Sequence, residues 1–350
     1  MSFQKMDKIH INGKFLTQKQ TGVQRYAREI VAALDDMNLS VNLMIVLPTG
    51  DWDIPEYKNI QVKQVGIFGG ILWEQITFPF YLMRNRAASL NLCNAAPLLS
   101  PGYSTIHDVK VLSHPQFFGW KFRWWYRLLF ANQTRRCKAI FTVSEQVKKD
   151  ILYYYPALSP DKIFVTPDAW QHFERIDYDE QTLIKYGLGK GKYYFAMGSL
   201  EPNKNFRWIA EVAKRNPEDV FAVAGSLNTK VFSNGLGFEC PKNMRFLGYV
   251  SDEEAKTLMR DAKAFLFPSF CEGFGMPPLE ALSAGVPRII VSDIPVMHEI
   301  FKENAIYINP NYYEYDLDQL LANSHCDAEK VLREFSWKKS AEILLSALQK

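Results

Sequence analysis

The sequence predicts an α/β protein with two doubly wound domains, each a parallel sheet covered by helices, that face each other across a cleft. Short, continuous apolar runs such as 43–47 and 264–267 are typical of strands that are buried on both faces. These runs alternate with segments of helical periodicity such as 23–34 and 252–262, and this alternation implies parallel sheets. The length of 350 residues suits two domains of about 100–200 residues each.

The individual elements follow the same two patterns along the chain. In the first half, apolar runs predict strands at 9–11, 43–47, 89–92, 104–106 and 139–143, and periodicity predicts helices at 23–34, 116–136 and 145–154. In the second half, strands are expected at 193–197, 221–224, 244–247, 264–267 and 288–291, and helices at 205–215, 252–262 and 279–284. Ligands of such sheets bind outside the carboxyl ends of the strands, so we look for a site in the loops that follow them.

The patterning is weakest over 166–191, which is rich in glycine and aspartate. We therefore place the domain junction there. The sequence predicts one Rossmann-like domain over 1–168, a second over 169–335, and a C-terminal helix in 336–350 that packs back toward the first domain.

Composition and charge narrow the function classes. The net charge of +3 divides unevenly, because residues 1–168 carry +7 and residues 169–350 carry −4. The basic half suits an acidic ligand or an anionic membrane. Five scattered cysteines without paired spacing argue against a disulfide framework or a zinc site. Without a signal peptide or a membrane-spanning apolar run, the expected location is the cytoplasm.

Two glutamates, Glu272 and Glu280, stand eight residues apart around a glycine- and proline-rich break. A strand is expected before the break, and a helix that ends at Gly285 is expected after it. A strand, a glycine loop and a helix N-terminus together form an anion-binding arrangement, because free amides and the helix dipole point at the ligand. The alternative is an ordinary glycine-rich turn with two surface glutamates.

A second strand, turn and helix of this kind contains Lys204 in the run 198–205 (GSLEPNKN). A lysine ammonium at this position can neutralise a phosphate, although a solvated surface lysine is the simpler interpretation. Two such sites in one domain suggest a diphosphate held between Lys204 and the loop at 272–276.

With these motifs, the chain resembles the retaining, nucleotide-sugar-dependent glycosyltransferases of family 4, which have the two-domain GT-B fold. The C-terminal half is similar in 246–254 (FLGYVSDEE), in the E-x7-E segment 268–281 (PSFCEGFGMPPLEA), in 285–287 (GVP), in 291–295 (VSDIP) and in Glu299. The N-terminal half is similar in 21–26 (TGVQRY), in 73–75 (WEQ), and in His107 and Asp108 with Pro115 nearby.

The resemblance implies a role for each matching position. Catalytic roles fall to Lys204, which would hold the diphosphate, to Glu272, which would contact the donor sugar, and to His107, which would lie at the sugar and acceptor. Donor binding falls to Gly22, Ser199, Phe274, Gly275, Met276 and Glu280, with Glu280 at the ribose hydroxyls. The first domain would bind the acceptor and the second the nucleotide sugar. Without an Asp-x-Asp motif, no metal or other cofactor is expected.

The resemblance also implies a reaction and its partners. The expected activity is sugar transfer, with retention, from a UDP- or GDP-linked sugar to a glycan or polyprenyl-linked acceptor in cell-surface polysaccharide or lipopolysaccharide synthesis. The sequence departs from the family at Ser199 and Asn203, where an arginine often stands, and Arg207 follows one helical turn later. Two alternatives therefore stay open: a nucleotide-sugar epimerase of the same fold, and a catalytically weak glycan- or nucleotide-binding protein. His107 also has a simpler interpretation as a loop histidine that caps a turn.

The segment 117–130 (FFGWKFRWWYRLLF) interleaves aromatic residues with lysine and arginine. Such a helix can lie in a membrane interface, which would make the protein peripheral on the inner face of the membrane. The alternative is an amphipathic helix whose aromatic side chains pack in the core. No basic stripe or binding motif indicates a nucleic acid partner.

Overall fold

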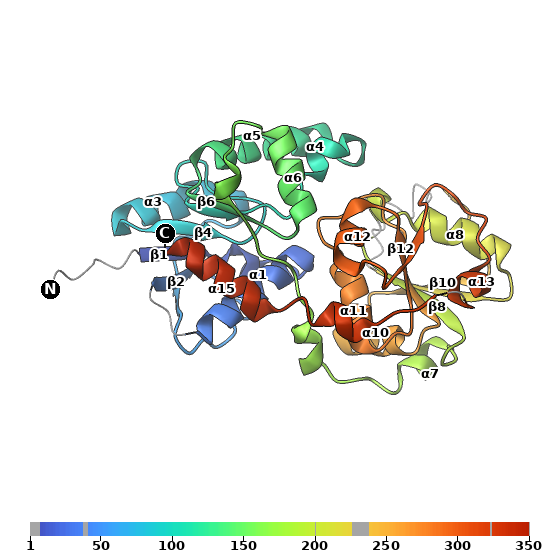
Figure 1. Ribbon diagram of the computed structural model, residues 1–350. Helices are drawn as coiled ribbons and strands as arrows, with labels where there is room; N and C mark the ends of the chain where they lie inside the picture. Colours follow the sequence, from blue (N-terminus) through green and yellow to red (C-terminus); the bar gives the residue numbers. More distant parts are fainter. Residues whose placement is uncertain (1–7, 38–40, 200, 226–237, 323, 350) are drawn as a thin grey trace. The chain divides into compact units, whose positions relative to one another are not determined.

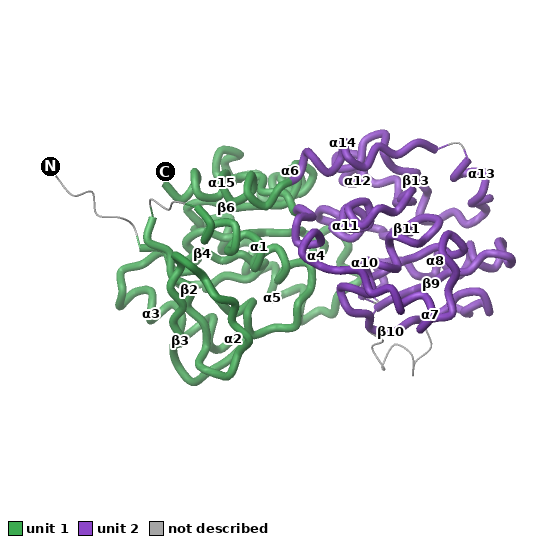
Figure 2. The backbone as a smooth tube through the Cα atoms, turned by 90° about the horizontal axis from the view of Figure 1, so that it is seen from below, with its two compact units in different colours: residues 1–168, 336–350 green, residues 169–335 purple. Residues whose placement is uncertain are grey.

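The computed structural model describes residues 8–37, 41–199, 201–225, 238–322 and 324–349. The chain forms two compact units (Figure 2): unit 1 is residues 1–168 together with 336–350, and unit 2 is residues 169–335. Each unit contains one sheet whose strands all pair in parallel. The predicted α/β class with two doubly wound sheets is therefore confirmed.

Unit 1 contains a seven-stranded sheet in the order β3-β2-β1-β4-β5-β6-β7. Its strands are β1 (Lys8–Asn12), β2 (Asn42–Leu47), β3 (Gln61–Gln64), β4 (Ala88–Asn91), β5 (Tyr103–Thr105), β6 (Ala139–Thr142) and β7 (Ile163–Val165). Its helices are α1 (Gly22–Asp35), α2 (Gly70–Leu72), α3 (Phe78–Asn85), α4 (Lys110–Ser113), α5 (Trp120–Arg136), α6 (Glu145–Tyr154) and α15 (Trp337–Leu348). The π-helical segment η2 (Trp73–Thr77) joins α2 to α3. The strand order reverses between β1 and β4.

The helices of unit 1 cover both faces of its sheet. The connection from β1 to β2 crosses the sheet in one direction, whereas the connections from β3 to β4 and from β5 to β6 cross it in the other. Because such connections are right-handed, α1 lies on one face and α3 and α5 lie on the opposite face (Figure 1). The C-terminal helix α15 lies beside α1, where the rings of Tyr26 and Trp337 meet edge to face at 6.0 Å.

Unit 2 contains a six-stranded sheet in the order β10-β9-β8-β11-β12-β13. Its strands are β8 (Tyr193–Met197), β9 (Val220–Ala224), β10 (Met244–Gly248), β11 (Ala264–Phe267), β12 (Ile289–Ser292) and β13 (Ile306–Ile308). Its helices are α7 (Thr182–Tyr186), α8 (Phe206–Arg215), α10 (Asp252–Arg260), α11 (Met276–Ala284), α12 (Pro295–Phe301), α13 (Leu317–Ala322) and α14 (Ala328–Leu332). Trp208, Phe221 and Leu266 are central to its core. Here the strand order reverses between β8 and β11.

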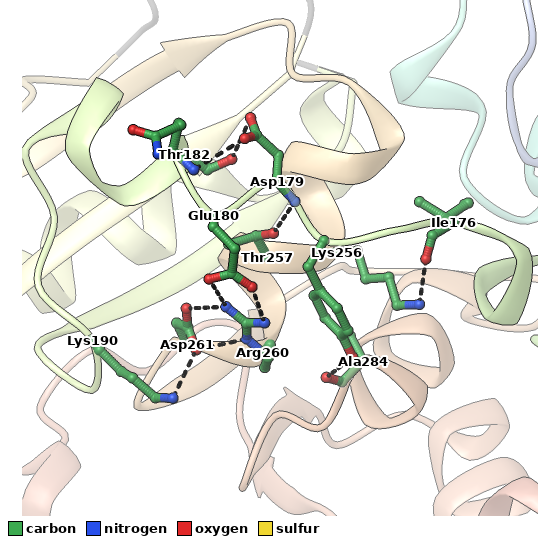
Figure 3. Close-up of polar contacts among 12 residues, drawn as sticks. Ile176, Asp179, Glu180, Thr182, Lys190, Lys256, Thr257, Arg260, Asp261 and Ala284 are labelled. Carbon is green, nitrogen blue, oxygen red and sulfur yellow. Dashed lines mark hydrogen bonds and ion pairs between the residues drawn. The ribbon is translucent and has the colours of Figure 1, made fainter.

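Polar contacts join helix α10 to the segment 173–179, which enters unit 2 (Figure 3). The Lys256 ammonium donates to the backbone carbonyls of Phe173 and Ile176, both at 2.6 Å. The backbone N–H of Asp179 donates to Thr257 Oγ1 at 2.9 Å. These bonds satisfy backbone groups of a segment that has little regular structure, so the segment is held as part of unit 2.

The main departures from the predicted elements have local causes. Strand β3 was not expected, because all four of its residues are exposed and it has no apolar run. Helix α5 begins at Trp120 rather than at 116, since a 3-10 turn at Pro115–Phe117 precedes it. Helix α11 begins at Met276, three residues before the expected start, and two prolines occupy its first turn, where amide donors have no helical partner.

Candidate functional site

Two polar loops meet where the strand order of the unit 2 sheet reverses. Strands β8 and β11 pair in parallel, so the loops that follow them leave the same edge of the sheet. Lys204 lies in the first loop and Glu272 in the second, 68 residues later, and the Lys204 ammonium donates to Glu272 Oε1 at 2.6 Å. The structure thus brings together the two catalytic candidates that the sequence predicts for this unit. Such a switch point is where open α/β sheets bind their ligands.

The pair is largely but not fully removed from solvent. The side chain of Lys204 is 18% exposed and that of Glu272 is 7% exposed. The ammonium also lies 5.1 Å from the centre of the Phe267 ring, close enough for a cation–π contact. An ammonium has three N–H donors, so its bond to Glu272 does not exhaust its donor capacity. Lys204 can therefore donate to an anion without leaving the carboxylate.

Asn205 fixes the loop that carries Lys204. Its backbone is left-handed, with φ 54°, a conformation that asparagine tolerates better than most residues. Its side-chain amide donates to the carbonyls of Pro268 at 3.0 Å and Pro310 at 2.9 Å. One buried side chain thereby joins the loops after β8, β11 and β13. Ser199, a predicted donor-binding residue, is exposed in the same loop, and Leu200 of the glycine turn lies outside the described residues.

Gly275 sets the entry into helix α11. Its φ of 113° disfavours any side chain, and a Cβ at this position would lie 2.6 Å from Met297 Cε. The neighbouring Phe274 is buried, with its ring edge to face with that of Phe335 at 5.2 Å. Because residues 277 and 278 are prolines, Met276 has the only amide N–H of the first three helical positions. The expected backbone donors at 274–276 therefore lie at a helix start whose geometry only glycine allows.

Glu280 has a different partner from Glu272. It lies within α11 with its side chain 6% exposed, and its Oε1 is 2.8 Å from Nε2 of the buried His172. His172 belongs to the 3-10 turn Gln171–Arg175, in the segment that enters unit 2. The sequence analysis missed His172. Nothing in its weakly patterned surroundings marks it, since only the tertiary fold brings it to a residue 108 positions away.

Two further candidates, Gly22 and His107, belong to unit 1. Gly22 is the first residue of α1, and no atom lies within 4 Å of the position that a Cβ would take. His107 follows β5, and its Nε2 is 2.9 Å from the carbonyl of Leu92. Since a carbonyl can only accept, Nε2 carries the proton. Burial lowers the pKa of His107, so the imidazole is neutral at pH 7. The expected places of Gly22 at the donor phosphate and of His107 at the sugar and acceptor stay predictions.

A buried polar cluster lies at the switch point of the unit 1 sheet. Asn12 ends β1 and Asn91 ends β4, and Asn12 Nδ2 donates to Asn91 Oδ1 at 3.1 Å and to Glu74 Oε1 at 2.9 Å. Lys14 donates to the other oxygen of Glu74 at 2.6 Å. Glu74 lies in η2, and single turns of π-helix often mark functional positions. The sequence analysis noted Glu74 only within a motif and did not single out its partners.

Among the residues that the structure describes, no group of three or more His, Cys, Asp or Glu side chains is placed to hold a metal ion. The charges at the β8–β11 switch point are instead those of Lys204 and Glu272. Independence from a metal stays a prediction.

Sequence comparison relates the chain to proteins that transfer sugars. Residues 180–333 match the family model of glycosyl transferases group 1. The chain is 32% identical over 219 residues to the O-antigen chain mannosyltransferase RfbU of Salmonella typhimurium, a match that covers 61% of this chain and 58% of RfbU. It is 27% identical over 264 residues to the O-antigen chain mannosyltransferase B of Escherichia coli, a match that covers 69% of this chain and 64% of that protein. The matches thus span about three fifths of each relative.

Solved structures with the same fold cover nearly the whole chain. The Anabaena protein HepE, in complex with UDP and glucose, superposes with a TM-score of 0.69 at 13% identity, over 99% of this chain and all of HepE. The sucrose-phosphate synthase of Thermosynechococcus elongatus superposes with a TM-score of 0.66 at 14% identity, over 99% of this chain and 94% of the synthase. At these identities the likeness shows the fold, which is GT-B as the sequence predicts. The segment that matches the glycosyl transferases group 1 model, residues 180–333, includes Lys204, Glu272 and Glu280.

Proposed function

We propose that this chain transfers a sugar, with retention of anomeric configuration, from a UDP- or GDP-linked donor to a glycan acceptor of a cell-surface polysaccharide or lipopolysaccharide. The observation that carries the proposal is the Lys204–Glu272 pair at the β8–β11 switch point, 2.6 Å apart and mostly buried. The names of the two O-antigen mannosyltransferases support a surface glycan as product and make mannose the first sugar to test. The UDP and glucose in HepE support a nucleotide-linked donor.

Each residue has a distinct part in this proposal. Breaking the bond between sugar and diphosphate places negative charge on the leaving group, and fixed positive groups stabilise that charge. Lys204 supplies a full charge and the amide of Met276 supplies a dipole, without a metal or another cofactor. Glu272 accepts hydrogen bonds from sugar hydroxyls, and Glu280 accepts them from the ribose. Ser199, Phe274 and Gly275 complete the donor site, and Gly22 leaves room for a phosphate.

Retention follows from attack on the face that the leaving group vacates. The bond between the anomeric carbon and the diphosphate oxygen breaks, with its electron pair going to that oxygen. The acceptor oxygen bonds to the anomeric carbon on the same face, and its proton passes to the leaving diphosphate. Glu272 is a poor covalent nucleophile, because an ammonium at 2.6 Å neutralises it. His107, neutral with its proton on Nε2, presents Nδ1 as an acceptor for a hydroxyl of the sugar or acceptor.

A panel of donors tests the proposal. We expect UDP or GDP, and the corresponding sugar, to raise the melting temperature, whereas ADP would not. NMR of the product formed with a glycan acceptor should show the anomeric configuration of the donor. Conversion of the donor to an epimer without any acceptor would instead indicate an epimerase, and nucleotide binding without transfer would indicate a binding protein. A trapped sugar–Glu272 adduct would overturn the front-face mechanism.

We place the reaction on the cytoplasmic face of the membrane, where a lipid-linked acceptor would be available to a peripheral enzyme. The support is the basic half of the sequence and the aromatic-basic segment 117–130. Cell fractionation tests the location: the chain should sediment with membranes and be released by high salt. Retention in the soluble fraction at low salt would contradict it.

A further inference from the structure

Exposed, large apolar side chains concentrate in one stretch of unit 1. Between residues 62 and 128 they are Val62, Ile67, Phe68, Ile71, Leu72, Ile76, Phe80, Met83, Leu99, Trp120, Phe122, Trp124 and Leu128. The described residues of unit 2 expose only Tyr178, Ile184, Tyr249 and Tyr312 in the same class, from separate elements. Scattered apolar residues are normal on a protein surface, but a large cluster of them marks a surface that something covers.

The stretch forms one face of the unit 1 sheet. The α2–η2–α3 crossover and helix α5 lie on the same side, opposite α1 and α15 (Figure 1). The loop between β4 and β5 bridges them. Gln75 of η2 donates to the carbonyl of Ala96 and accepts from the N–H of Leu98, while Arg136 of α5 donates to the carbonyls of Leu98 and Leu99. The loop that carries the exposed Leu99 thus contacts both η2 and the C-terminal end of α5.

Helix α5 divides its aromatic residues between this face and the interior. Trp120, Trp124 and Leu128 follow a four-residue spacing and are 71%, 63% and 38% exposed. The rings of Phe122 and Tyr126 are in tilted contact, with centres 4.4 Å apart, while Leu129 and Phe130 are buried. One row of side chains in the segment 117–130 therefore packs inward and another is exposed, so contact of the exposed row with a membrane stays a prediction.

The same face is positively charged. Between residues 57 and 144 the sequence has eleven lysines and arginines and only two acidic residues. Of these two, Glu74 is 2% exposed and is bonded to Lys14, and Asp108 pairs with Lys110 at 3.4 Å. Lys63, Arg84, Arg86, Lys121 and Arg127 are exposed among the apolar side chains. A mixture of exposed tryptophan, aliphatic and cationic side chains complements an anionic lipid surface.

Two groups of the exposed apolar residues lie toward the edge of the sheet where the carboxyl ends of the strands emerge. Helix α5 runs from the carboxyl end of β5 back toward β6, and its exposed residues at 120–128 occupy its first half. The exposed residues at 67–72 likewise follow the carboxyl end of β3. His107, which follows β5, belongs to the same edge of the sheet. A membrane on this face would therefore lie beside the edge of unit 1 that the proposed function assigns to the acceptor.

We propose that the α2–η2–α3 crossover, Leu99 and α5 form a single membrane-docking face that binds the surface of an anionic bilayer. The apolar side chains enter the interface, and the lysines and arginines pair with lipid phosphates. The proposal refines the peripheral location given in the proposed function, and its link to a lipid-linked acceptor rests on the proposed sugar transfer, whereas docking to a bilayer does not depend on that transfer. Within the described residues, the structure contains no helix with the length and apolar character of a membrane span.

Vesicle sedimentation of the full chain tests the proposal. The vesicles are phosphatidylcholine alone, or phosphatidylcholine with about one third phosphatidylglycerol. One variant replaces Phe68 and Leu72 by Asp and a second replaces Trp120 and Trp124 by Asp, all exposed positions whose change leaves the core intact. The control, Ile184→Asp, changes a 77% exposed residue of unit 2. We expect binding to the anionic vesicles only, with each double variant weakening it about tenfold or more and the control unchanged.

Several outcomes would overturn the docking face. Equal binding to neutral and anionic vesicles would show that charge has no role. If only the Trp120 and Trp124 variant weakened binding, the α2–η2–α3 crossover would not belong to the docking face. The wild type could instead fail to bind vesicles and sediment as a dimer in their absence. If either double variant dissociated that dimer, the face would bind a second copy of the chain and not a membrane. UDP and GDP binding in solution, measured on the same variants, should not change. If the wild type bound neither UDP nor GDP, the proposed function would be contradicted, but the vesicle result would still support or contradict the docking face.

Discussion

The Nε2 atom of His172 lies 2.8 Å from Oε1 of Glu280, and both side chains are almost completely buried. His172 belongs to the segment that enters unit 2, whereas Glu280 belongs to the helix that follows the glycine loop. A buried carboxylate requires a partner, and this one is fixed at one oxygen by an imidazole. The carboxylate that we assign to the ribose therefore takes its orientation from a residue outside the motif, and His172 is a positioning residue.

Replacing His172 by Ala should weaken nucleotide binding. The Glu280 carboxylate would lose a hydrogen bond in a buried place, and bonds to charged groups contribute about 1.5–3 kcal/mol, so we expect the Kd to rise about tenfold or more. Calorimetry with UDP and GDP measures this change. Because we assign His172 to orienting Glu280 and not to the reaction itself, KM should rise more than kcat falls, and His172→Gln should restore part of the affinity.

An exposed pair provides the matched control for His172. His298 Nε2 lies 2.6 Å from Asp293 Oδ1, with both side chains at least half exposed. Water can replace such a partner, so His298→Ala should leave nucleotide affinity unchanged. Equal losses in the two variants would contradict a specific role for His172.

Replacing Lys204 by Ala should reduce transfer far more than it reduces folding stability. The ammonium would stabilise charge that develops on the diphosphate, and removal of one such group typically costs about 100- to 1000-fold in rate. Steady-state kcat and the melting temperature together separate the two effects. The control is Lys214→Ala, which removes an ion pair with Glu211 on the surface of α8. A fall in kcat of less than about tenfold at Lys204 would place the charge stabilisation elsewhere.

Replacement by alanine should have different effects at Gly275, where it should lower stability, and at Gly22, where it should weaken donor binding only. Gly275→Ala puts a Cβ 2.6 Å from Met297 Cε at a φ of 113°, so unit 2 should lose about 1–3 kcal/mol of stability. Gly22→Ala meets no atom within 4 Å and should leave stability unchanged. If Gly22 leaves room for a phosphate, its variant should nonetheless bind the donor more weakly. Chemical denaturation and donor titration of both variants make the comparison, and unaltered donor affinity in Gly22→Ala would remove Gly22 from the site.

The parts of the fold that depend on burial could be predicted from the sequence. Strand β11 was expected at its observed residues, because a strand buried on both faces reads as a continuous apolar run. Strand β3 could not be, since its four residues are exposed and its place comes from pairing with β2. The crossover that follows β3 was missed for a related reason: its exposed isoleucine and phenylalanine residues do not follow the pattern of a helix that faces a core.

The same distinction holds for the candidate site. Lys204 and Glu272 each follow a predicted strand, so their common edge could be foreseen before the strand order was known. His172, Asn205 and Lys14 could not be assigned, since each acts through a partner that is distant in the sequence. His172 reaches Glu280 across 108 positions, and Lys14 reaches Glu74 across 60. Tertiary hydrogen bonds of this kind have no periodicity that a sequence can reveal.

The buried His107 should make unit 1 less stable as the pH falls. Burial lowers the pKa of its imidazole below the ordinary 6.5, against smaller opposing effects of the hydrogen bond to the Leu92 carbonyl and of the nearby Asp108. Below about pH 6.5 the unfolded chain therefore binds a proton that the folded chain does not, so the free energy of unfolding falls as the pH falls. The total loss is up to about 1.4 kcal/mol for each unit by which the pKa in the folded state lies below 6.5. His10 and His114, whose pKa values burial also lowers, act in the same direction.

Proton NMR of the imidazole signals between pH 4 and pH 8 measures the pKa of His107 directly, with the signal assigned by its absence in His107→Gln. We expect it to titrate below 6.5, and we expect the Gln variant to lose less stability than the wild type when the pH is lowered from 7 to 5. The variant leaves His10 and His114 in place, so their contribution cancels in the comparison. If His107 titrated above 6.5, it would carry a positive charge near neutral pH. It would then be a candidate for stabilising the leaving group, rather than the neutral hydrogen-bonding group that its burial implies.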